Sequence, residues 1–151
     1  MNNPIHIHRN EYLQIIGLLA LASQYRETVQ DIQGALAKWL HVEPRGHGSD
    51  AIGEGYDADR LLELLLASGD IQEMPPHPIT LSVAGLLILG QGYERKLRGI
   101  HNELREMVRY PGDTQAPTSV PWEDAVLDAV WGEYDADHLL EELGIEIPEE
   151  P

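Results

Sequence analysis

The carboxylates of Glu103 and Glu106 are the pair whose spacing best suits catalytic chemistry. Because they stand three residues apart in a predicted helix, they project from the same side, one turn from each other. Carboxylate oxygens in this arrangement can hold Mg²⁺, the ion that many phosphate-cleaving enzymes use. The pair therefore makes a magnesium-dependent hydrolase one hypothesis for this chain.

The E-x-x-E pair resembles the first acidic motif of the all-α nucleotide pyrophosphohydrolases of the MazG type. That family adds a second motif, E-x-x-D, further along the chain, and the later acids at 123–128 and 133–137 lack its spacing. The equivalent positions in the first half of the chain, Ala35 and Lys38, carry no carboxylate. Since glutamates on a helix surface are usually solvated, the magnesium-dependent pyrophosphohydrolase is the alternative function and not the leading one.

Arg95 and His101 are a second candidate pair. Their spacing resembles the R-x(4–6)-H motif of HEPN ribonucleases, which are also all-α, although Lys96 stands where that family commonly has another polar residue. An arginine and a histidine at helical spacing also occur together by chance. We therefore expect Arg95, Lys96 and Arg98 to form an exposed basic face that balances nearby acids.

One phrase occurs twice, at 56–65 and at 134–143. In each copy we expect the first aspartate, Asp57 or Asp135, to be a helix N-cap, and the second to lie near the positive end of the helix dipole. An Asp-x-Asp pair can also bind a metal, but Arg60 follows the first copy, and a guanidinium beside a cation site is repulsive. The phrase therefore indicates helix capping. The two copies read Tyr-Asp-Ala-Asp-Arg-Leu-Leu-Glu-Leu-Leu and Tyr-Asp-Ala-Asp-His-Leu-Leu-Glu-Glu-Leu.

Apolar residues at spacings of three and four predict two long helices, over about 10–41 and about 79–109. Their apolar positions align at an offset of 68, whereas the tyrosine phrase repeats at an offset of 78. The aligned pairs include Gly17 with Gly85, Leu21 with Leu89, Tyr25 with Tyr93 and Ile32 with Ile100. The alignment indicates that each half of the chain begins with the same helix.

In the first half, the segment 42–55 is dense in helix breakers and is expected to be a loop, with 49–55 less helical than its counterpart in the second half. A short helix is predicted from Asp57 to about Ser68, where Gly69 ends it.

In the second half, short helices are predicted over about 121–131 and over 135–143, the latter ended by Gly144. Residues 1–8 are expected to be a short strand or an extended arm, and 145–151 an acidic, frayed tail.

The chain of 151 residues is long enough for one compact domain. We expect an all-α fold in which two tandem helical repeats, about 9–72 and about 78–147, form a pseudo-two-fold helix bundle within a single domain, 1–151. The two long helices would pack as an antiparallel pair that the short helices close. One repeat alone would leave apolar faces exposed, so the two are expected to bury each other's faces, as in a homodimer fused into one chain.

The formal net charge is −16, and no lysine or arginine follows Arg109. Such a field repels nucleic acid and anionic lipid and attracts basic surfaces. Because the chain has no cysteine, disulfides, thiolate catalysis and cysteine-bound zinc are excluded. The start of the chain lacks a signal-peptide pattern, and its longest apolar run, 15–22, is too short to span a membrane, so we expect a cytoplasmic protein.

We therefore expect a non-enzymatic protein-interaction module, without cofactor or metal, whose acidic C-terminal third binds a basic protein surface. It resembles in type the small acidic helical proteins of phages and mobile elements, which implies an inhibitor, an immunity or anti-defence protein, or a nucleic-acid mimic. Direct binding to nucleic acid or membrane is not expected, whereas a homodimer is compatible with the sequence. A phage-type structural or assembly protein that self-associates through its long helices is the further alternative. The expected partner-binding residues are Glu133, Asp135, Asp137, Glu141 and Glu142.

Overall fold

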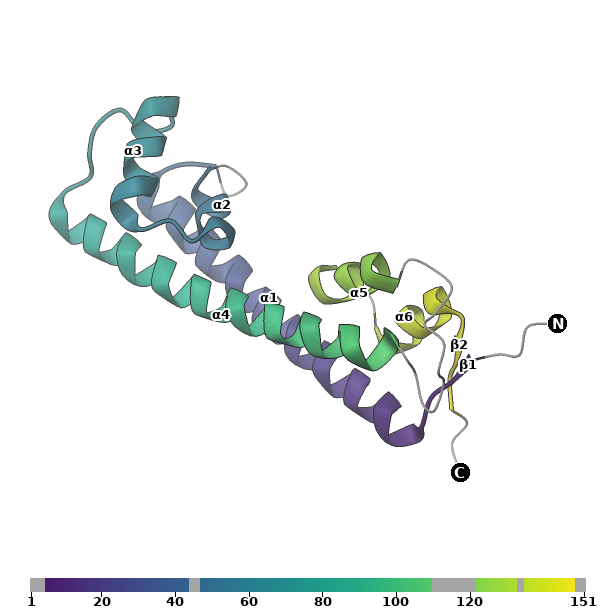
Figure 1. Ribbon diagram of the computed structural model, residues 1–151. Coiled ribbons are helices and arrows are strands. Elements are labelled where there is room, and N and C mark those ends of the chain that lie inside the picture. The colour runs from purple at the N-terminus through teal and green to yellow at the C-terminus, as the bar shows by residue number, and fades with distance from the viewer. Residues whose placement is uncertain (1–4, 44–46, 110–121, 133–134, 149–151) are drawn as a thin grey trace. The chain divides into compact units, whose positions relative to one another are not determined.

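A computed structural model describes residues 5–43, 47–109, 122–132 and 135–148 (Figure 1). This part of the chain is all-α, as the sequence predicts, apart from two strands of two residues each. The elements are β1 (Ile5–His6), α1 (Arg9–Leu40), α2 (His47–Glu54), α3 (Ala58–Ser68), α4 (His77–Arg109), α5 (Trp122–Trp131), α6 (Ala136–Leu143) and β2 (Ile145–Glu146).

The two long helices, α1 and α4, form where the apolar periodicity predicts them. Neither contains an interior proline, and Pro78 lies in the first turn of α4, where its missing N–H breaks no helical hydrogen bond. Most predicted apolar positions are buried, but Ile16 and Trp39 of α1 are exposed. The largest fully buried side chains of the two helices are Ile15, Leu36, Leu87, Leu97 and Leu104.

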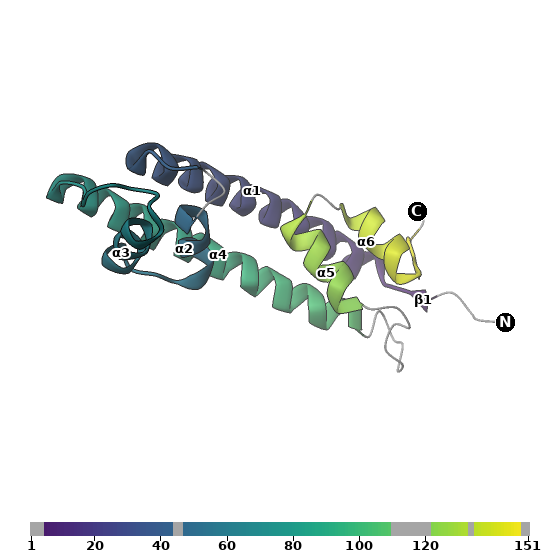
Figure 2. The ribbon, with the colours of Figure 1, turned by 90° about the horizontal axis from the view of Figure 1, so that it is seen from above.

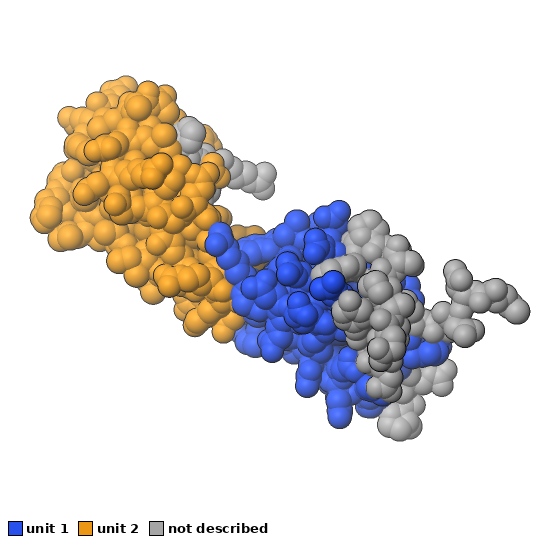
Figure 3. All heavy atoms as spheres, in the orientation of Figure 1, with its two compact units in different colours: residues 1–24, 97–151 blue, residues 25–96 orange. Residues whose placement is uncertain are grey.

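The chain divides into two compact units (Figure 3). Unit 1 comprises residues 1–24 and 97–151, and unit 2 comprises residues 25–96. Both boundaries fall inside the long helices, so each unit takes part of its core from α1 and part from α4. Neither unit therefore coincides with an expected repeat, about 9–72 or about 78–147. The apolar stripe of each long helix must be covered by a partner helix, so each unit combines segments from both halves of the chain.

In unit 2, the second part of α1 and the first part of α4 run side by side in opposite directions (Figures 1 and 2). The Tyr25 and Tyr93 rings meet between them, with centroids 5.7 Å apart. Helix α2 packs so closely on α4 that a Cβ added at Gly90 would lie 2.9 Å from Cδ1 of Ile52. Because Gly90 has no side chain, α2 can pack closely against α4 at this position.

The prediction of a loop throughout 42–55 was wrong, because α2 occupies residues 47–54. Its Ala51 and Ile52 are fully buried, and α2 contacts α3. The glycines of this segment have low helix propensity, and burial of an apolar face outweighs that cost.

In unit 1, α5 and α6 accompany the first part of α1 and the last part of α4. Strands β1 and β2 pair in parallel, with Ile5 opposite Ile145 and His6 opposite Glu146. The expectation of a frayed tail from residue 145 was therefore wrong at residues 145–146. Ile145 is buried, and this burial anchors the segment that follows α6.

The two short helices α3 and α6 begin and end alike. The Asp57 carboxylate accepts a hydrogen bond from the Arg60 N–H, and the Asp135 carboxylate accepts one from the His138 N–H, each at 2.8 Å. Each helix ends at a glycine with positive φ. The capping roles predicted for both aspartates are confirmed. The buried residues also correspond: Ala58, Leu61, Leu62 and Leu65 in α3, and Ala136, Leu139, Leu140 and Leu143 in α6.

Candidate protein-interaction surface

The last three elements of unit 1 carry many exposed carboxylates. We call the exposed carboxylates of α5, α6, the α6 N-cap and β2 the acidic face. Four of the five carboxylates predicted to bind a partner belong to it, and the fifth, Glu133, lies outside the described residues. Lysine and arginine are absent from the sequence beyond Arg109, so no cation of that stretch offsets this charge. The acidic face comprises Glu123, Asp124, Asp128, Asp135, Asp137, Glu141, Glu142 and Glu146.

Two of the predicted binding carboxylates already have structural partners within unit 1. Asp135 caps α6, and Asp137 accepts a hydrogen bond from the Tyr12 hydroxyl of α1. Asp137 also lies in the first turn of α6, where negative charge is favourable. Helix stability and attachment to α1 thus account for both residues, and neither is a suitable position for testing partner binding.

Glu141 and Glu142 are exposed in the last turn of α6, which contains no basic residue. A negative charge at this end of a helix meets the negative end of the dipole and costs about 0.3–1 kcal/mol. Asp128 has the same unfavourable position in the last turn of α5. At these positions the three negative charges weaken their own helices and do not stabilise them.

An open hollow lies at the end of α5. Leu127, Asp128, Trp131 and Gly132 line it. Leu127 is exposed and Trp131 is half-buried, so the hollow offers apolar surface beside the Asp128 carboxylate. A partner side chain could bury apolar area here while its own charges pair with the surrounding acids. The apolar pattern of the sequence did not indicate this hollow, since Leu127 lies off the apolar face that α5 turns to the core.

Glu103 and Glu106 are both exposed on α4 in unit 1. Within the described ranges, no group of three or more histidine, aspartate or glutamate residues could hold a metal ion, at this pair or at either Asp-x-Asp phrase. Nothing in the geometry of the described chain therefore adds a ligand to the glutamate pair.

The positive charge that acts on His101 is that of Arg105, one turn further along α4. Arg95 is exposed in unit 2, whereas His101 and Arg105 are half-buried on α4 in unit 1. His101 Nδ1 and Arg105 Nε are buried and have no hydrogen-bond partner. Burial and then the Arg105 guanidinium lower the pKa of His101 from 6.5, and Glu123 opposes that shift. The imidazole is therefore neutral at neutral pH.

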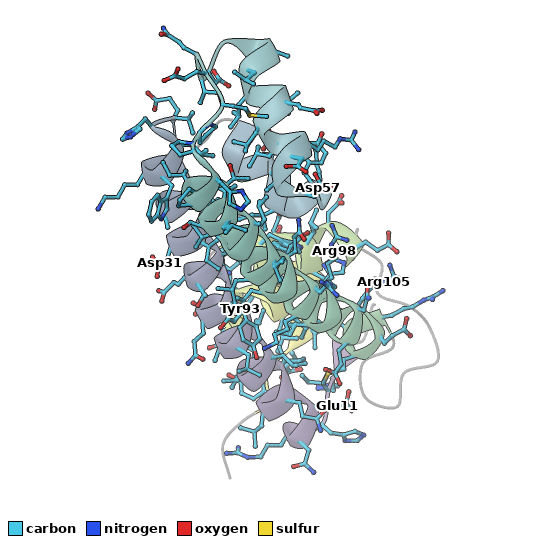
Figure 4. All side chains as sticks on the ribbon, turned by 90° about the vertical axis from the view of Figure 1, so that its left-hand side faces the viewer. Glu11, Asp31, Asp57, Tyr93, Arg98 and Arg105 are labelled. Atoms are coloured by element: carbon cyan, nitrogen blue, oxygen red, sulfur yellow. The ribbon has the colours of Figure 1, made fainter. Side chains whose placement is uncertain are left out.

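The three cations expected to form one exposed face divide between the units. Lys96 Nζ lies over the Tyr25 and Tyr93 rings of unit 2, at 5.2 and 5.1 Å from their centroids, as cation–π contacts. Arg98 belongs to unit 1 and projects from the same side of α4 as Arg105 (Figure 4). Lys96 therefore helps to hold α1 against α4.

No family model matches the chain, and no curated relative and no solved structure of similar fold is found. None of the described helices is long and apolar enough to cross a membrane.

Proposed function

We propose that this protein is a non-enzymatic interaction module that binds a basic protein surface through the acidic face of unit 1. Inhibitors, immunity and anti-defence proteins and nucleic-acid mimics act in this way, and the proposed activity belongs to that class. The partner contributes lysine and arginine side chains to the carboxylates, and an apolar side chain to the hollow at Leu127 and Trp131.

The observation that carries the proposal is the position of Asp128, Glu141 and Glu142. All three are exposed in last helical turns, where their charges oppose the helix dipole. Because these charges weaken their own helices, their presence is explained if they bind a positively charged partner. Asp128 also borders the apolar hollow. Basic partners associate faster with such a surface because the field steers them to it.

We further propose that the chain arose from two tandem copies of one helical repeat, related by a pseudo-two-fold axis. The matching caps and buried residues of α3 and α6 support it. So does the contact between Tyr25 and Tyr93, which correspond at the offset of 68, since equivalent residues meet near a two-fold axis. On this proposal, the acidic face is a specialisation of the second copy: Glu142 corresponds to Leu64 in the first.

The test is affinity capture from the native host with the Glu141→Lys/Glu142→Lys variant. Wild-type protein should retain a partner with a basic surface, and this variant should lose it, because charge reversal turns attraction into repulsion. Raising the salt concentration should also release the partner, since exposed charges are screened.

The matched control is the Glu63→Lys/Glu73→Lys variant of unit 2. Both residues are exposed, the change in net charge is the same, and Glu63 corresponds to Glu141 at the offset of 78. The control should retain the partner. Equal loss from both variants, or binding that is indifferent to salt, would reject the acidic face as the binding site.

A further inference from the structure

Helix α4 exposes a stripe of large apolar side chains in unit 2. Leu81, Ile88 and Leu89 are 60%, 67% and 55% exposed. Gly85 lies among them, and a Cβ added there would meet nothing within 4 Å. We call these four residues the α4 stripe. Large apolar side chains that are exposed together on one side of a helix, unlike single ones, are typical of interaction surfaces.

The stripe faces away from the short helices of unit 2. Gly90 is the α4 position that contacts Ile52 of α2. At 3.6 residues per turn, Leu81 lies about 180° from Gly90 around the helix axis, Ile88 about 160° and Gly85 about 140°. The elements of unit 2 therefore cover one side of α4 and leave the stripe uncovered.

Helix α1 has the same feature in unit 1. Leu13 and Leu21 are 50% and 43% exposed, Ala20 is exposed between them, and a Cβ added at Gly17 would meet nothing within 4 Å. These four residues are the α1 stripe, and each matches a residue of the α4 stripe at the offset of 68. Ala22, the position equivalent to Gly90, is fully buried. Each helix therefore turns the same side toward the core of its unit and exposes the same side.

Both stripes lie in segments without charge. No aspartate, glutamate, lysine or arginine occurs between Glu11 and Arg26, or between Glu73 and Glu94, in a chain of net charge −16. A basic partner would find no carboxylate there. Membrane-surface helices carry lysine and arginine beside their apolar face, and these segments have none. Two copies of so acidic a chain repel each other, and a charge-free surface is where they can meet at least cost.

We propose that the α1 stripe and the α4 stripe are each a contact surface between copies of this chain. A second copy offers to each stripe an apolar and charge-free stripe that can cover it. In a two-fold dimer each stripe is buried by a stripe of the partner. The glycines at the centre of the stripes would let the helix backbones approach closely.

Sedimentation velocity from about 1 µM to about 1 mM tests the proposal. Wild-type protein should dimerise, and Leu81→Glu/Ile88→Glu should raise the dimer dissociation constant at least about tenfold. Leu13→Glu/Leu21→Glu should do the same through the other stripe. Leu81→Lys/Ile88→Lys should also weaken the dimer, because loss of apolar burial matters whatever the sign of the new charge. Circular dichroism verifies that each variant is folded, as expected for exposed positions.

The matched control is Trp39→Glu/Met74→Glu, which adds the same two charges at exposed apolar residues outside both stripes and should leave dimerisation unchanged. Raising NaCl from about 50 mM to about 500 mM should strengthen the dimer by screening its net charge, the opposite of the effect on a basic partner. A monomer at every concentration, a dimer unaffected by the stripe variants, or equal loss with Trp39→Glu/Met74→Glu would overturn the proposal. The proposal would also be overturned if the wild-type protein is monomeric and the stripe variants lose binding to a different, apolar partner protein.

Discussion

Replacing Gly90 by alanine tests the close approach of α2 to α4. In an exposed helix interior, glycine to alanine stabilises by about 0.8–1.0 kcal/mol, because alanine has the higher helix propensity. At Gly90 the added Cβ would lie 2.9, 3.0 and 3.2 Å from the Cδ1, Cγ1 and Cγ2 atoms of Ile52. Ile52 is 1% exposed and β-branched, so it has little freedom to move aside.

Overpacking of this kind costs about 1–3 kcal/mol. After the gain in helix propensity, Gly90→Ala should change the free energy of unfolding by between about zero and a loss of about 2 kcal/mol. Gly34 of α1 is the matched control in the same unit, since a Cβ there meets nothing within 4 Å. Gly34→Ala should stabilise by up to about 1 kcal/mol.

Urea denaturation followed by circular dichroism measures both variants. A double-mutant cycle isolates the contact: in an Ile52→Ala background, which removes the opposing atoms, Gly90→Ala should be stabilising. If Gly90→Ala stabilises the wild-type chain as much as Gly34→Ala does, the close packing of α2 on α4 is refuted.

Three further predictions concern the caps, the buried histidine and the glutamate pair. Asp57→Ala and Asp135→Ala should each lower the free energy of unfolding by about 1 kcal/mol, as measured by urea denaturation, and unequal losses would contradict their equivalent roles. The lowered pKa of His101 means that the unfolded chain binds more protons below pH 6.5, so this residue's contribution to stability is full above that pH and is lost as the pH falls. The stability difference between wild type and His101→Gln should therefore shift against wild type between about pH 7.5 and about pH 5.5; a constant difference would mean that the imidazole is not held neutral. Finally, millimolar Mg²⁺ should shift the melting temperature of wild type and of Glu103→Ala/Glu106→Ala equally, because two exposed carboxylates alone bind the ion weakly; a shift confined to wild type would revive the hydrolase hypothesis.

Local chemistry made several elements predictable. A capping aspartate, an acidic first turn and a terminal glycine lie within one short segment, so α3 and α6 could be located from the sequence. The long helices followed from apolar periodicity sustained over many turns, which only a helix converts into one continuous face.

The candidate site was predictable in part. The concentration of acids after Arg109 indicated which segment carries the charge, because net charge is additive along the chain. The sequence also predicted that Asp135 caps a helix, but it did not separate Glu141 and Glu142 from Asp137, since only the fold shows that Asp137 accepts a hydrogen bond from Tyr12. The hollow at Leu127 could not be predicted either, because it depends on which side of α5 faces the core.

The sequence by itself determined the helical class, the ends of the capped helices and the location of the charge, because each depends on residues close together in the chain. Tertiary structure decided that α2 is helical, that β1 pairs with β2, and that each compact unit draws on both long helices. These features depend on burial against residues far away in sequence, such as Ile52 against Gly90. For the same reason, only the fold shows which apolar residues, Leu81 and Ile88 among them, remain exposed for another molecule to cover.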